Sequence, residues 1–218
     1  MFGITDLWLF IISGIALNLI PGPDSLYVIG RSASQGFKAG SVAAFGIGAG
    51  TFVHIFAAAF GLSAILATSA AAFTAIKIIG CIYLLYIGIS MILSKSSVAA
   101  DKPKVSKANM WKVFRQGFFT NALNPKVALF FLAFVPQFIA LDAPNKAIAF
   151  VILGLIFNFN AIIWGHILAW SSAKISAKIQ SQTERDDSPQ RQQRLANVMN
   201  KIAGSLFLGF GVKLALTE

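Results

Sequence analysis

The segment at residues 18–24, NLIPGPD, interrupts an apolar run that otherwise extends from about residue 7 to residue 29. A run of this length is long enough to cross the hydrocarbon core of a bilayer as a helix. Proline removes a helix hydrogen bond and clashes with the preceding turn, so Pro21, Gly22 and Pro23 predict a break inside the span. Freed backbone groups in a membrane need partners within the protein or in a water-filled cavity. We therefore expect this break to line a cavity.

A second break is predicted at Asn124-Pro125-Lys126, inside an apolar run at about residues 113–138. Asparagine is typical of a helix N-cap and proline of the first helical position, so a new half-helix is expected to begin here. Lys126 would then lie at a helix start, where the helix dipole disfavours a cation. We expect it to need an anionic neighbour, either Asp24 or the carboxylate of a bound substrate.

The other apolar runs complete a pattern of about six transmembrane helices. The predicted spans cover approximately residues 7–29, 41–66, 70–93, 113–138, 147–173 and 198–216. Of the 218 residues, 56% are hydrophobic and only 12% are charged, and the mean hydropathy is +0.73. That leaves too few polar residues to cover a soluble domain of this size. The predicted fold class is an all-α integral membrane protein, with membrane lipid as its solvent.

The basic residues predict the orientation of the chain. Most of the 18 Lys and Arg residues lie in or beside three connecting segments, residues 30–40, 94–112 and 174–197. Lys and Arg are enriched in cytoplasmic loops, so these segments are predicted to be cytoplasmic and both termini to lie outside. The same distribution explains the net charge of +10, and nucleic acid is not an expected partner.

The central linker divides the chain into two halves of three spans each. A single membrane domain, 1–218, then consists of residues 1–93, the linker 94–112 and residues 113–218. Halves with an odd number of spans enter the membrane in opposite orientations, as in inverted-repeat transporters. Gly14-x-x-x-Asn18 and Gly117-x-x-x-Asn121 precede the two breaks at corresponding positions. The sequence therefore predicts two inverted three-helix repeats.

Exposed half-helix ends can bind a zwitterion. Helix N-termini attract a carboxylate, and free carbonyls or an acidic side chain attract an ammonium group. At about 1.5 Å per residue, Asp24 would lie about three-quarters of the way along its span and Lys126 about halfway along the oppositely directed one. We therefore predict two half-sites in place of a direct ion pair. The candidate substrate- and proton-binding residues are Asn18, Pro21, Gly22, Pro23, Asp24, Asn121, Asn124, Pro125 and Lys126.

Other polar and aromatic residues within the spans permit simpler interpretations. His54 and His166 lie in mid-span, where they can relay protons or serve as hydrogen-bonded core residues. Trp111, Trp164 and Trp170 are interpreted as anchors at the membrane interface. Close helix packing is predicted at Gly46, Gly48 and Gly50.

Several motifs together resemble the lysine-exporter and homoserine/threonine-efflux (LysE/RhtB-type) family. They are Asn18-Leu-Ile-Pro-Gly-Pro-Asp24, Gly30-Arg31, Gln35-Gly36, Ala39-Gly40, Gly61-Leu62, the run at residues 77–88, Phe114-x-x-Gly117, Asn121-Ala-Leu-Asn-Pro-Lys126 and the run at residues 131–138. The likeness is good over residues 7–138 and looser beyond. It implies a six-helix exporter of amino acids or close derivatives in the bacterial inner membrane, driven by the proton motive force. Small zwitterionic solutes and protons are the implied partners, and the sequence leaves a homo-oligomer open.

Two other functional classes fit the sequence less well. A divalent-cation transporter could share the architecture, but metal transport calls for clustered His, Asp, Glu or Cys ligands, and the chain offers two scattered histidines and one deep acid. A membrane-embedded enzyme would need a constellation such as HExxH, GxSxG or paired intramembrane acids, and the sequence has none. We therefore predict a transporter that is not an enzyme and that needs no cofactor or metal.

Overall fold

A computed structural model describes residues 2–64, 75, 78, 82, 89 and 109–181 of the chain, with side chains to residue 177. The predicted sixth span at 198–216 lies outside the described residues. So does the third span at 70–93, apart from four single positions. The structural statements below concern the described part of the chain.

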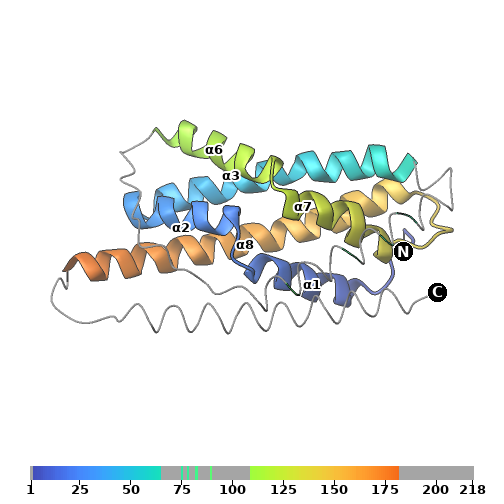
Figure 1. The fold of residues 1–218 in the computed structure, drawn as a ribbon, viewed down its shortest axis with the longest axis horizontal. Helices are drawn as coiled ribbons and strands as arrows, with labels where there is room; N and C mark the ends of the chain where they lie inside the picture. The colour runs from blue at the N-terminus through green and yellow to red at the C-terminus, as the bar shows by residue number, and fades with distance from the viewer. Residues whose placement is uncertain are drawn as a thin grey trace.

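Helices account for almost all of the described chain, as predicted (Figure 1). In chain order they are α1 (Leu7–Leu19), α2 (Pro23–Gln35), α3 (Phe37–Phe56), the π-helical η1 (Ala57–Leu62), α6 (Met110–Ala122), α7 (Pro125–Leu129), the π-helical η2 (Phe130–Phe134), the 3₁₀-helical η3 (Val135–Phe138) and α8 (Lys146–Ser181). Breaks separate α1 from α2 and α6 from α7, at the two prolyl segments where the sequence predicts them.

Four of the predicted spans can be followed in the described residues. The segments Phe37–Leu62 and Lys146–Ala177 are each long and apolar enough to cross a membrane as single helices. The other two candidates are bent pairs, with an angle of 55° between α1 and α2 and 45° between α6 and the Pro125–Phe138 segment. The helices extend further than predicted: α2 continues to Gln35 instead of ending near residue 29.

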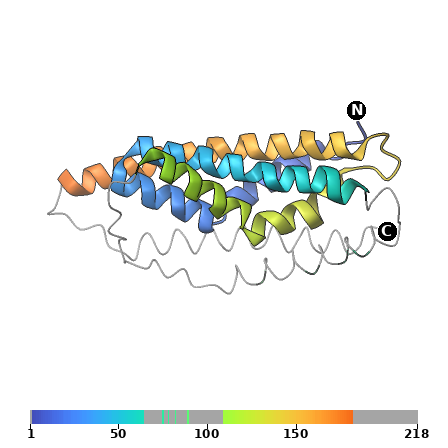
Figure 2. The same ribbon diagram turned by 90° about the horizontal axis from the view of Figure 1, so that it is seen from above.

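The two broken helices run antiparallel, and both breaks fall near the middle of the long axis (Figure 1). The unbroken helices α3 and α8 extend along most of that axis beside them (Figure 2). At one end, the residues before α1 pair with those after η3 through a bridge between Ile4 and Ile139 and a 2.9 Å hydrogen bond from Thr5 N to Phe138 O. This pairing joins the two broken helices at the end where α1 begins.

Glycines allow α3 and α6 to pack with their backbones nearly in contact. A Cβ atom added to Gly46 would lie 2.3 Å from the carbonyl oxygen of Phe114, and one added to Gly50 would lie 2.5 Å from that of Phe118. Gly48 faces α8 instead, where a Cβ atom would lie 2.9 Å from the Ile162 side chain. The predicted role of these three glycines in close packing is confirmed.

Two hydrophobic clusters lie on either side of the breaks. The first is rich in phenylalanine and joins α1, η1, α8 and the segment from α7 to η3; its members include Phe10, Phe130, Phe134, Phe138 and Phe150. The second is built of smaller residues from α2, α3, α6 and α8: Val28, Ala43, Ala44, Ile47, Val113 and Ala169. The polar residues of the breaks therefore lie between two apolar regions.

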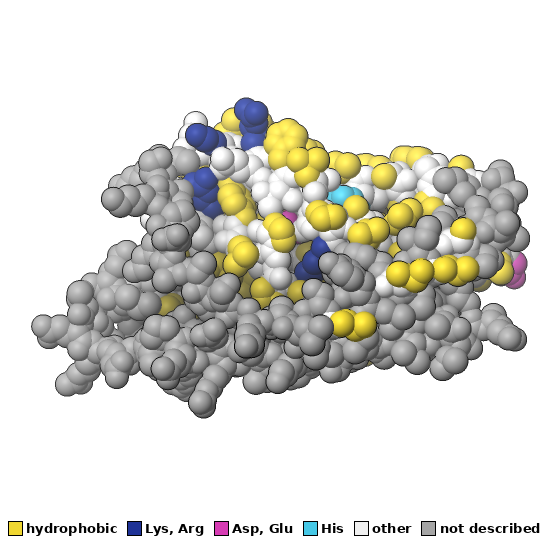
Figure 3. Space-filling model, in the orientation of Figure 1, with side chains coloured by type: hydrophobic (Ala, Val, Ile, Leu, Met, Phe, Trp, Pro, Cys, Tyr) yellow, Lys and Arg dark blue, Asp and Glu magenta, His cyan; other side chains and the backbone are white. Residues whose placement is uncertain are grey.

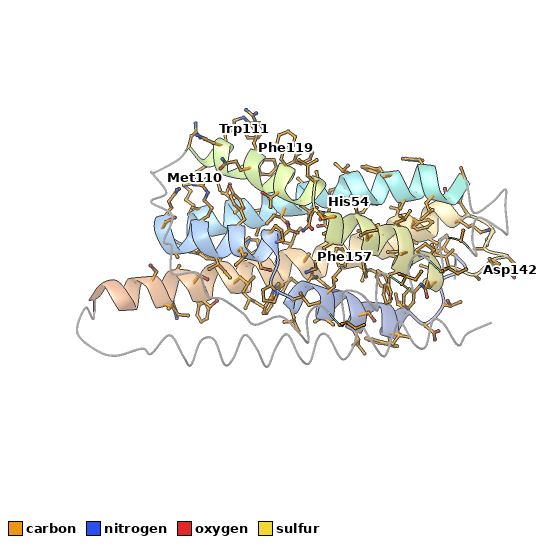
Figure 4. The ribbon with its side chains drawn as sticks, viewed as in Figure 1. His54, Met110, Trp111, Phe119, Asp142 and Phe157 are labelled. Carbon is orange, nitrogen blue, oxygen red and sulfur yellow. The ribbon has the colours of Figure 1, made fainter. Side chains whose placement is uncertain are left out.

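Charge is distributed unevenly along the long axis. On the face shown in Figure 3, Lys and Arg side chains gather over the end where α6 begins. Lys112 and Arg115 are exposed there, and Asp142 is exposed at the opposite end (Figure 4). Trp111, at the basic end, is 62% exposed, which fits its interpretation as an interface anchor.

Candidate functional site

A small polar cavity lies where the two breaks meet. Its volume is about 40 Å³, enough for a few water molecules but not for an amino acid. The polar side chains that line it are those of Asn18, Asp24, Ser25, Asn121, Asn124, Lys126 and Trp164. Figure 4 labels Phe157, another lining residue, on α8 at the level of the breaks.

The Asp24 carboxylate has one occupied and one free oxygen. Its Oδ2 atom accepts a hydrogen bond of 2.8 Å from Asn121 Nδ2 and another of 3.0 Å from Asn124 Nδ2. Its Oδ1 atom is buried and has no hydrogen-bond partner. A buried carboxylate oxygen without a partner is costly, so Oδ1 is the position at which a cation or a proton would be most strongly favoured.

Both asparagine amides are held in place by contacts on their other side. The backbone N–H of Lys126 donates to Asn124 Oδ1 at 3.0 Å, so Asn124 caps α7 as predicted and its NH₂ group faces Asp24. Asn121 Oδ1 lies 3.2 Å from the Thr51 hydroxyl of α3, which directs its NH₂ group toward Asp24 in the same way. The carboxylate therefore meets two preoriented donors.

Lys126 binds the end of α1. Its ammonium nitrogen donates to the carbonyl oxygens of Leu17 at 2.8 Å and Ile20 at 3.1 Å. These carbonyls belong to a helix C-terminus, where unpaired oxygens and the helix dipole favour a cation. The direct partners of Lys126 in this conformation are therefore backbone carbonyls, while Asp24, one of the two anionic neighbours expected from the sequence, lines the same cavity. An ammonium group has three donors, so one N–H remains beyond these two bonds.

The structure brings Asp24 and Lys126 to one cavity, although their side chains bind different partners. The sequence predicts that Asp24 and Lys126 lie at different depths in the membrane. This prediction is wrong, because it depends on a first span that ends near residue 29. Since α2 continues to Gln35, Asp24 lies near the middle of the bent pair. Residues of both predicted half-sites therefore line one cavity.

Two more donors line the cavity without partners. The Nδ2 atom of Asn18 and the Nε1 atom of Trp164 are both buried and lack a hydrogen-bond partner. The interpretation of Trp164 as an interface anchor is wrong, because α8 extends from Lys146 to Ser181 and places this residue mid-helix. Trp170 is 53% exposed, as expected of an anchor. The sequence signal that could have identified Trp164 as a cavity residue is its position well inside its apolar run.

The remaining candidate residues shape the breaks. Gly22 lines the cavity in an extended conformation, and Pro23 occupies the first turn of α2. Pro125 occupies the corresponding place in α7, and with Pro23 it lines a neighbouring groove. Pro21 is exposed and lies between α1 and α2. Pro23 and Pro125 begin the half-helices, and none of the three prolines lines the cavity itself.

Neither histidine lines the cavity. His54 is buried on α3, with Nε2 2.9 Å from the carbonyl oxygen of Asn121 and its ring stacked on Phe131. His166 lies on α8, where Nε2 is 2.8 Å from the Ser41 hydroxyl. Of the two interpretations left open by the sequence, the geometry favours hydrogen-bonded packing for both residues, and for His54 an indirect role in positioning Asn121.

The fold and this cavity define a class: a multi-spanning membrane protein with a polar site between two broken helices. The chain matches the family described as LysE type translocator over residues 15–218. It is 30% identical to an uncharacterized membrane protein of Pseudomonas aeruginosa over 217 residues, which cover 98% of this chain and 96% of that one. The protein therefore belongs to the LysE-type translocator family, whose members are transporters and not enzymes.

Other relatives have names that specify a cargo. The chain is 27% identical over 217 residues to the leucine efflux protein of Salmonella typhimurium, covering 100% of this chain and 98% of the relative. It is 28% identical over 218 residues to the leucine efflux protein of an Enterobacter species, with 98% and 97% covered. No solved structure matches the chain.

Proposed function

We propose that this protein exports amino acids, or close derivatives, across the bacterial inner membrane in exchange for protons. Membership of a translocator family and the leucine efflux relatives support amino-acid export. The observation that carries the proposal is that Asp24, Asn18 and Trp164, each with one buried polar atom that has no hydrogen-bond partner, line one cavity together with Lys126. These are the groups that the two ends of a zwitterion require.

In this proposal the substrate ammonium group binds Oδ1 of Asp24. The carboxylate of the substrate binds the remaining N–H of Lys126 together with Asn18 Nδ2 and Trp164 Nε1. Charge-assisted hydrogen bonds of this kind are the stronger ones in proteins. The free atoms are covered by neighbouring side chains in the present conformation, so the cavity must widen to admit a substrate.

We base the proposed coupling to protons on the Asp24 carboxylate, which has only one oxygen, Oδ1, without a hydrogen-bond partner. Because Oδ2 already accepts two N–H groups, an entering proton and a substrate ammonium would compete for Oδ1. A proton that arrives from outside would weaken the hold of Asp24 on the ammonium group and favour substrate release. Loss of that proton to the cytoplasm would restore the site, which is the exchange required of an antiporter.

Alternating access would be provided by two inverted three-helix halves, residues 1–93 and 113–218. Supporting this, each break follows a helix with an asparagine in its last turn, Asn18 or Asn121. Each following half-helix begins with a proline and continues with an ionisable residue, Asp24 in α2 and Lys126 in α7. Rocking of such halves about a central site is the usual behaviour of inverted-repeat transporters.

The proposed orientation puts the turn between α2 and α3 at Gly36, together with residues 94–112 and 174–197, in the cytoplasm and both termini outside. The basic residues at one end support this orientation. A cation transporter is less well supported. Among the described residues, no group of three or more His, Cys, Asp or Glu side chains is placed to hold a metal ion.

The central test replaces the Asp24 carboxylate with the isosteric amide. In proteoliposomes, Asp24→Asn should abolish leucine exchange driven by a proton gradient while the protein is still made and inserted in normal amounts. Asp142→Asn, which removes the same charge from an exposed position at one end of the molecule, should transport normally. Full proton-coupled transport by Asp24→Asn would remove Asp24 from the mechanism.

A further inference from the structure

A groove lies along the contact between α2 and α6, on the basic side of the breaks. Its volume is about 600 Å³, and its lining includes Tyr27 and Arg31 from α2 and Gln116 and Thr120 from α6. Asn124, which holds Asp24 in the central cavity, also lines this groove. The groove thus adjoins the central site from the end of the molecule where basic residues gather.

Arg31 is the charged residue of this groove, and its guanidinium group is only partly satisfied. The side chain is 9% exposed and lies over the Tyr27 ring, with 5.4 Å between Cζ and the ring centroid. One terminal nitrogen, Nη2, donates to Gln116 Oε1 at 2.5 Å. The other, Nη1, is buried without a hydrogen-bond partner. Tyr27 is itself fixed by a 2.8 Å hydrogen bond to the Val113 carbonyl.

We propose that Arg31 forms a second carboxylate-binding site, which receives the substrate on its way to the central cavity. Guanidinium groups bind carboxylates with two parallel hydrogen bonds. Here a carboxylate would pair with Nη1 and compete with Gln116 for Nη2. Among the described residues of the groove lining, Arg31 is the one with a formal charge, so none of these residues supplies a carboxylate that competes for it. This inference rests on the proposed export of amino acids for its role in transport.

The transport test uses vesicles in which either face can be presented to substrate. Arg31→Gln should raise the KM for leucine about tenfold at the basic face and leave the KM at the opposite face unchanged. Leucinamide, which keeps the ammonium group but lacks the carboxylate, should show no such rise. Arg115→Gln removes the same charge from an exposed position on α6 and should behave like the unmodified protein.

A binding test separates this site from the proposed function. Calorimetric titration of the purified protein with 4-methylpentanoate, a carboxylate without an amino group, should detect binding that Arg31→Gln weakens about tenfold, whether or not leucine is transported. The neutral 4-methylpentanamide should not bind at this site. Equal binding by both proteins would overturn the proposal. So would an equal loss of leucine and leucinamide transport, since Arg31 would then serve only to hold α2 against α6.

Discussion

At the scale of a single residue, a substitution of Trp164 tests whether its indole N–H binds the substrate carboxylate in the central cavity. Trp164→Phe keeps an aromatic ring against the cavity but removes the free N–H. Because hydrogen bonds to charged groups contribute about 1.5–3 kcal/mol, we expect the KM for leucine to rise at least tenfold, with little change for leucinamide. Uptake and exchange in proteoliposomes would measure both constants.

Trp170→Phe provides the matched control, because this residue lies on the same helix but is 53% exposed. It should leave both constants unchanged. If Trp164→Phe raises the constants for leucine and leucinamide equally, the indole contributes to packing and does not bind the carboxylate.

Local sequence features revealed some residues of the site and missed others for an identifiable reason. Asp24, Asn124 and Lys126 could be predicted because ionisable and proline-flanking residues are conspicuous within an apolar run. The partners of Lys126 could not, since they depend on where the end of α1 crosses α7. Trp164 was missed because tryptophan is common at membrane interfaces, and only its depth in α8 distinguishes it.

At the scale of elements, the crossing of α3 and α6 depends on Gly46. A methyl group there would lie 2.3 Å from the backbone carbonyl of Phe114, so the helices must separate. Overpacking of this kind costs about 1–3 kcal/mol. Gly46→Ala should therefore lower the thermal unfolding midpoint in detergent. Since α6 carries Asn121, the separation should also reduce transport.

Gly30 in α2 provides the control for Gly46→Ala, because the same substitution there should not force two helices apart. A methyl group there would meet no atom of the described residues within 4 Å, and alanine favours a helix over glycine by up to about 1 kcal/mol. Gly30→Ala should therefore leave the unfolding midpoint unchanged or raise it. A similar fall for both variants would show that the loss at Gly46 reflects something other than the close crossing.

The sequence predicts where the helices break better than it predicts where they end. Proline chemistry located both breaks, because a proline at a helix start is a strong local signal. The bends of 55° and 45° arise from packing between distant segments and have no local signature. The first span extends past its predicted end near residue 29, because a charged residue such as Arg31 is typical of a loop but here lies within α2. Its burial against Tyr27 and Gln116 allows the helix to continue past it.

At the scale of the whole molecule, the uneven charge predicts which end faces the cytoplasm. After Cys81→Ser removes the native thiol, Lys112→Cys and Asp142→Cys would each place one cysteine at an exposed position at opposite ends. We expect a membrane-impermeant maleimide to label the Asp142→Cys protein in intact cells. The Lys112→Cys protein should be labelled only after the membrane is permeabilised.

This orientation also determines what the Arg31 groove can do. With the basic end in the cytoplasm, a substrate would meet Arg31 before Asp24, and protons driven inward would reach Asp24 from the opposite end. That order suits export, because the carboxylate is bound on the side from which cargo leaves the cell. The reverse labelling pattern would place Arg31 on the outer side, where a carboxylate site would retain cargo that has already been exported. Labelling therefore tests the predicted topology and shows which side of the membrane the Arg31 groove faces.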